Sequence, residues 1–193
     1  MNANSRIGIL ELGRPTLATA ARAMLEEAGL SISLWKAQVP SDLFAVLEAG
    51  PTSPDYLVIC ADADAGGIVF PRAASEFDLE NMRHGRLPFD KIRERVFLPH
   101  KVVIGAGPGL GHPDCARAMV DGGAALYFGA PGDVDGASIL VWLSVFFTQH
   151  LVRGKTMDQA CARAASVDAV AAQFRMYGPT GVLPLGPLEQ AGR

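Results

Sequence analysis

The chain has 193 residues, of which 49% are hydrophobic and 19% are charged, and its formal net charge is −3. This length most often forms one domain, and it can bury a core without metals or disulfides. An acidic balance without a basic run argues against nucleic acid as a partner. The chain has three cysteines, Cys60, Cys115 and Cys161, which lie far apart in the sequence. An odd number without paired spacing argues against a disulfide framework or a zinc knuckle and favours reduced thiols in the cytoplasm.

Two stretches bear on membrane location. Residues 1–15 contain polar residues up to position 6 and then Glu11, so they lack the apolar core of a signal peptide. Residues 137–152 are the one candidate span, but the run is short for a bilayer and contains Gln149 and His150. A buried core or interface helix is the better interpretation, and we expect no membrane contact.

The first sixty residues alternate strands and helices with short connections. Strands are expected over residues 7–10, 30–35 and 56–60. Helices are expected over residues 15–28 and 43–48, the second capped by Ser41 and Asp42. This β-α-β-α-β order predicts a parallel sheet with right-handed crossovers, followed by a loop over residues 61–67 at the carboxyl end of the third strand.

Residues 70–99 do not continue this alternation of strands and helices. They are charged, they contain three prolines, and they have one helical piece over residues 90–96. A connection of this length inside a compact domain is usually a lid or a binding loop, so we expect a lid-like excursion over the carboxyl edge of the sheet. Within it, Arg83, His84 and Arg86 could close over an anionic ligand, although a solvated charged loop is the favoured interpretation.

The second half of the chain continues the alternation. Strands are expected over residues 102–104 and 124–128, and helices over residues 113–120, 135–153 and 156–172. The last helix begins with the capping-box spacing of Thr156 and Gln159. The tail over residues 178–193 is rich in Pro, Gly and Leu, and we expect it to pack loosely. The helix over residues 135–153 is more apolar than one sheet face requires, which leaves core and homodimer interface both open.

A glycine-rich loop follows the strand over residues 102–104, at the kind of position where α/β sheets bind ligands. We predict that its backbone lines a ligand site at Gly105, Ala106, Gly107 and Gly109. A nucleotide- or flavin-binding flavodoxin-like module is one interpretation, but the third glycine of a dinucleotide fingerprint would fall at Leu110. No Gly-Lys-Ser/Thr follows either, so a phosphate loop is excluded. We therefore predict no cofactor, and the cysteine spacing, which fits no zinc knuckle, leads us to predict no metal.

The order of motifs from residue 56 to residue 163 is distinctive. YLVICADADAGG precedes KVVIGAGPGLG, which is followed by DGGAALYFGAPGDVDGAS and then by VFFTQHLVRGKTMDQACARA. This order resembles the caspase-like fold shared by caspases, gingipain-type peptidases and bacterial CHAT domains. The resemblance implies a three-layer sandwich with a mostly parallel sheet, and the length of the chain predicts a single α/β domain over residues 1–193. A flavodoxin-like fold is the alternative.

The same resemblance bears on activity. Active members carry a His-Gly in the first site loop and a nucleophilic Cys in the second. Here Cys60-Ala61-Asp62-Ala63-Asp64 has no histidine, and the loop from Gly105 to Gly109 has no cysteine. Cys60 is expected to point into the core. The resemblance therefore implies a caspase-like pseudoenzyme without peptidase activity. We predict that it is cytoplasmic, as its unpaired cysteines indicate, and that it binds a ligand or a protein partner at the carboxyl edge of its sheet.

Polar residues near these loops leave an enzymatic alternative open. Asp62 and Asp64 follow the third predicted strand, and His112 ends the glycine loop. Together they could form the acid–base site of a small-molecule hydrolase or lyase. A solvated acidic turn and a helix-capping histidine explain the same residues without chemistry. Glu11 follows the first predicted strand on the same edge and could line the same pocket.

Overall fold

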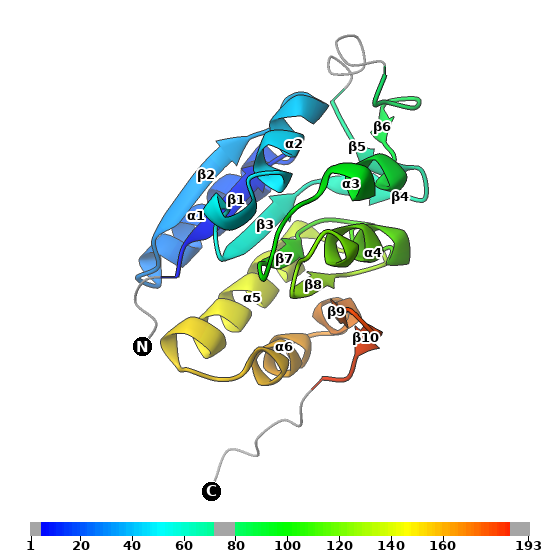
Figure 1. Ribbon diagram of the computed structural model, residues 1–193. Coiled ribbons are helices and arrows are strands. Elements are labelled where there is room, and N and C mark those ends of the chain that lie inside the picture. The colour runs from blue at the N-terminus through cyan, green and yellow to red at the C-terminus, as the bar shows by residue number, and fades with distance from the viewer. Residues whose placement is uncertain (1–4, 72–79, 186–193) are drawn as a thin grey trace, which may run out of the picture.

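A computed structural model of the chain describes residues 5–71 and 80–185. Its main sheet has seven strands in the order β10-β9-β8-β7-β3-β1-β2 (Figure 1). The strands are β1 (Ile7–Glu11), β2 (Ile32–Lys36), β3 (Tyr56–Cys60), β7 (Val102–Gly105), β8 (Leu126–Gly129), β9 (Arg175–Gly178) and β10 (Gly181–Leu183). The pairings among β2, β1, β3, β7 and β8 are parallel, whereas β9 and β10 pair antiparallel. The predicted mostly parallel sheet is confirmed.

Helices cover both faces of this sheet, which makes three layers (Figure 1). One face carries α1 (Pro15–Glu27), α5 (Gly136–Phe147) and α6 (Met157–Ala165), and the other carries α2 (Pro40–Leu47), α3 (Phe89–Arg95) and α4 (Pro113–Asp121). Successive side chains of β3 alternate between the two cores: Val58 packs on the side of α1 and α5, whereas Leu57 and Ile59 pack on the side of α2 to α4. A strand buried on both faces therefore reads as a continuous apolar run.

A second, small sheet stands beyond the carboxyl end of β3. It consists of β4 (Asp62–Asp64), β5 (Gly67–Val69) and β6 (Arg86–Leu87), paired antiparallel in the order β4-β5-β6. The predicted plain loop over residues 61–67 is therefore wrong. Its residues have low strand propensity, and they are held extended by tertiary packing, because Ile68 and Leu87 are both fully buried.

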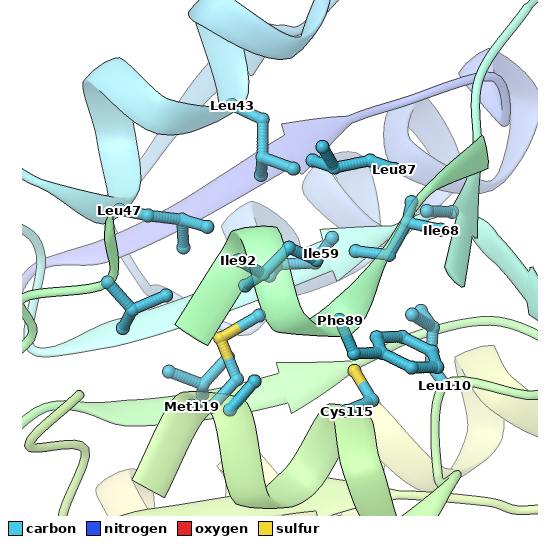
Figure 2. Close-up of a cluster of buried hydrophobic side chains, with 14 of the residues drawn as sticks. Leu43, Leu47, Ile59, Ile68, Leu87, Phe89, Ile92, Leu110, Cys115 and Met119 are labelled. Atoms are coloured by element: carbon cyan, nitrogen blue, oxygen red, sulfur yellow. The ribbon is translucent and has the colours of Figure 1, made fainter. Parts of the chain in front are cut away.

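Part of the excursion belongs to the core. Figure 2 shows Leu87, Phe89 and Ile92 in the same apolar cluster as Leu43 of α2 and Cys115 of α4. Residues 80–98 are thus anchored on the sheet. Residues 72–79 lie outside the described residues, so a lid role for the excursion stays a prediction. The tail also contributes, because β10 pairs with β9, and residues 186–193 lie outside the described part.

Three helix boundaries differ from those expected. Helix α2 begins at Pro40, whose fixed φ suits the first helical position, and the Asp42 carboxylate accepts hydrogen bonds from the backbone N–H groups of Gln38 and Val39. Helix α5 gives way after Phe147 to a π-helical turn, η3 (Thr148–Val152). Helix α6 ends at Ala165, and a separate 3₁₀ turn, η4 (Ala171–Gln173), follows because Asp168 accepts two backbone N–H groups there.

The many apolar side chains of α5 pack mainly in the core of the protein. Trp142 and Phe146 are fully buried, and the Trp142 ring stacks on Phe146 and Phe174 with centroids 4.9 and 4.4 Å apart. Core packing therefore explains most of this helix, and the homodimer stays a prediction. Across residues 5–71 and 80–185, no helix combines the length and the apolar character needed to cross a membrane.

Candidate functional site

The loops that follow β3 and β7 meet at the carboxyl edge of the sheet and are bonded to each other. The backbone N–H of Ala63 donates to the carbonyl of Pro108 at 2.9 Å, and that of Ala106 donates to Ile59 at 2.8 Å. The Gly109 N–H reaches the carbonyl of Gly132, beyond β8, at 3.2 Å. Three chain segments are thereby joined into one backbone network at this edge.

The glycines of this loop are required by the protein's packing on itself. A Cβ atom on Gly107 would lie 1.6 Å from the carbonyl oxygen of Ala61, and one on Gly109 would lie 2.0 Å from that of Ala63. Ala106 is fully buried, and the Cβ position of Gly105 is occupied by the hydroxyl of Tyr127. The space in which a ligand would meet these glycines is filled by protein atoms, so the geometry gives no support to the predicted backbone cradle.

Two buried tyrosines of β8 and β9 hold the glycine loop through hydrogen bonds to its backbone. The Tyr127 hydroxyl donates to the carbonyl of Leu110 at 2.5 Å, and the Tyr177 hydroxyl donates to that of Gly111 at 2.8 Å. Burial raises the pKa of both phenols, so both stay protonated and act as donors at neutral pH. This role of the two tyrosines was not predicted from the sequence. A tyrosine in a buried strand usually has a hydrogen-bond partner for its hydroxyl, so the role could have been expected.

We expect Tyr127→Phe to lower the free energy of unfolding by about 1–3 kcal/mol, because it leaves the buried carbonyl of Leu110 without its donor. Urea denaturation measured by circular dichroism checks this. An unchanged midpoint would mean that backbone contacts alone hold the loop.

Asp62 lies in a cleft at this same edge. Its carboxylate accepts a hydrogen bond from Nη1 of Arg14 at 2.9 Å, across 48 residues of chain. The cleft has a volume of ≈ 660 Å³ and is formed by the β1–α1 loop, the glycine loop and the first turns of α1 and α5. Its lining comprises Gly13, Arg14, Pro15, Thr16, Leu17, Ala20, Asp62, Pro108, Gly136 and Leu140. A charged pair in an otherwise mostly apolar hollow suits a small ligand or a short peptide. We call it the edge cleft.

Asp64 is engaged elsewhere. Nε of Arg86 lies 2.9 and 2.7 Å from its two carboxylate oxygens, and the backbone N–H of Gly66 donates to it at 2.8 Å. Burial would raise the pKa of Asp64, but the hydrogen bonds from Arg86 and Gly66 outweigh that effect and lower it. This carboxylate is therefore a structural anion at neutral pH.

His112 and Glu11 also have local partners. Nδ1 of His112 accepts the backbone N–H of Asp114 at 3.2 Å and so caps α4, and its ring stacks on Phe89 with centroids 5.5 Å apart. Glu11 pairs with Lys36 at 3.7 Å and does not line the edge cleft. Within the described residues, no hydrogen bond joins His112 to Asp62 or Asp64, so the acid–base hypothesis gains no support from the geometry.

The three cysteines are inaccessible. Cys60, Cys115 and Cys161 are fully buried and unpaired, and burial raises the pKa of each thiol to about 12. The expected inward orientation of Cys60 is confirmed. None of these thiols is a thiolate nucleophile at neutral pH. In the part of the chain that the structure describes, no three His, Cys, Asp or Glu side chains gather to hold a metal ion.

The architecture is that of the caspase-like cysteine peptidases. The chain superposes on separase from Saccharomyces cerevisiae, solved with securin, with a TM-score of 0.55 and 10% identity over 90% of this chain. It superposes on the Arg-specific cysteine proteinase gingipain R with a TM-score of 0.54 and 6% identity over 93% of this chain. The complex of the pro- and mature domains of RgpB from Porphyromonas gingivalis superposes with a TM-score of 0.54 and 7% identity over 94% of this chain.

These likenesses confirm the predicted caspase-like fold, and at such low identity they concern the fold alone. The chain spans 12% of the separase chain and 47% of the gingipain chain, so the activities of those longer proteins are not transferred to it. Neither the protein-family models nor the curated proteins contain a match.

Proposed function

We propose that this chain is a caspase-like domain without cysteine-peptidase chemistry, which acts by binding a small ligand or a short peptide in the edge cleft. The observation that carries the proposal is the packing of the two site loops. The resemblance implies a nucleophile in the loop from Gly105 to Gly109, and a Cβ atom on Gly107 or Gly109 would there lie 1.6 or 2.0 Å from the carbonyl oxygens of Ala61 or Ala63. Every cysteine of the chain is buried with a raised pKa, so none replaces that nucleophile.

The edge cleft is the better binding position because it remains open where the glycine loop is closed. It presents the Arg14–Asp62 pair, whose side chains are 23% and 53% exposed, beside apolar lining from α1 and α5. A ligand with a carboxylate or an amide could exchange hydrogen bonds with this pair. A cytoplasmic location is part of the proposal and is supported by the three free thiols.

The loss of peptidase chemistry can be tested by thiol labelling. We expect the native protein to react with a thiol reagent such as Ellman's reagent only on the timescale of unfolding, and the protein in urea to react at all three cysteines. Rapid labelling of one cysteine in the native protein, together with peptide cleavage that this labelling abolishes, would contradict the proposal.

Binding in the edge cleft can be tested with a matched pair of variants. Thr16 lines the cleft, whereas Thr19 is exposed one turn further along α1 and does not. Metabolites and short peptides that raise the melting temperature of the wild type should lose that effect in Thr16→Trp and keep it in Thr19→Trp. Ligands that stabilise both variants equally bind elsewhere, and such a result would count against this cleft.

A further inference from the structure

A second cleft, of ≈ 610 Å³, opens on the opposite face of the domain, among the β4–β5 turn, β6, α3 and α4. Its lining comprises Ala65, Gly66, Arg83, His84, Arg86, Pro88, Phe89, Asp90, Arg93, Asp114 and Arg117. None of these residues lines the edge cleft. Its volume is that of a site for a small organic molecule. We call it the arginine cleft.

Among the described residues, the lining includes four arginines and no lysine. A guanidinium group presents five N–H donors in a planar fork that matches the oxygens of a phosphate or a carboxylate. The four come from three separate elements: Arg83 and Arg86 flank the turn before β6, Arg93 lies on α3, and Arg117 lies on α4. The fold, rather than a local run of basic sequence, brings them together.

Two of the arginines are held in place by acidic residues outside the lining. Arg86 is bound by Asp64 through Nε and Nη2, and its Nη1 donates to the carbonyl of His84 at 3.0 Å. Arg93 pairs with Asp121 of α4 at 2.5 Å. The guanidinium groups of Arg86 and Arg93 are therefore already engaged by carboxylates.

The other two arginines are only loosely engaged. Arg83 lies 4.0 Å from Asp90, and Arg117 lies 4.0 Å from Asp114. These separations are too long for hydrogen bonds, and the two arginine side chains are 70% and 63% exposed. Exposed pairs of this kind contribute little, so exchanging them for a ligand costs little.

We propose that the arginine cleft binds the phosphate group of a small organic phosphate, with Arg83 and Arg117 as its direct ligands. Asp90 and Asp114 also line the cleft and repel anions, so the ligand must compete with them for both arginines. A phosphate dianion does this better than a single carboxylate, because its oxygens can accept bidentate hydrogen bonds from both guanidinium groups.

The test is a titration of the full chain with inorganic phosphate, followed through the arginine Nε–H resonances by NMR. We expect the resonances of Arg83 and Arg117 to shift together, and the affinity to fall by about tenfold in each of Arg83→Ala and Arg117→Ala. Arg83→Lys, which keeps the charge and loses the fork, should also bind more weakly. The control is Arg22→Ala, an exposed arginine of α1 that should bind phosphate as the wild type does.

Three outcomes would overturn the proposal. These are the absence of saturable phosphate binding, an equal loss of affinity in Arg22→Ala, and binding of succinate as tight as that of phosphate. The Thr16→Trp variant, which blocks the edge cleft, should leave phosphate binding unchanged. The test thus stands whether or not the proposed function is right.

Discussion

Gly107→Ala should unfold the domain or lower its free energy of unfolding by at least about 3 kcal/mol. The added methyl group would lie 1.6 Å from the carbonyl oxygen of Ala61, and that oxygen belongs to the backbone between β3 and β4. It cannot turn aside as a flexible side chain would, so the loop or the end of the sheet must shift. Urea denaturation of the purified variant measures the loss.

Gly136→Ala is the matched control. Gly136 is the first residue of α5, and the nearest atom to a Cβ built on it is 3.9 Å away, on Leu17. We expect this substitution to change stability by less than about 0.5 kcal/mol, or to stabilise slightly. If the two variants were equally stable, the two site loops would not be interlocked as described.

Trp142→Ala should cost about 3–5 kcal/mol, because it leaves a cavity where three aromatic rings now pack. Trp142 is fully buried and lies within 5.8 Å, centroid to centroid, of Phe128, Phe146 and Phe174. Thermal and urea unfolding of the variant measure the effect.

Trp142→Phe separates the loss of volume from the loss of polarity. The indole Nε1 of Trp142 is buried and has no hydrogen-bond partner among the described residues, so its removal relieves a desolvation cost. We expect this variant to lose less than half of what Trp142→Ala loses. An equal loss in both variants would mean that the indole nitrogen contributes a favourable contact.

Most of the parallel sheet could be predicted because its signals are local. The run from Tyr56 to Cys60 is apolar at every position, as a strand covered on both faces must be, and Gly29 ends a helical pattern at a left-handed backbone position. Such features depend on neighbouring residues alone. The caspase-like architecture followed from their order, which the comparisons confirm.

The site could not be predicted to the same degree, because its contacts join residues far apart in the chain. Asp62 and Asp64 look alike in sequence, but one binds Arg14 and the other binds Arg86, 48 and 22 residues away. The glycine loop has the composition of a ligand cradle, and only the position of Ala61 reveals that its glycines admit another stretch of backbone. The strands β4 to β6 were missed for the same reason, since Ile68 and Leu87 hold them through tertiary packing.

The contact between Gly107 and Ala61 also limits which side chains can be introduced at this edge. A cysteine side chain at position 107 needs space that the backbone after β3 occupies. The single substitution Gly107→Cys would meet that backbone before it could present a thiol. A thiol at this position therefore requires a second change, in the loop after β3, that moves the Ala61 carbonyl aside.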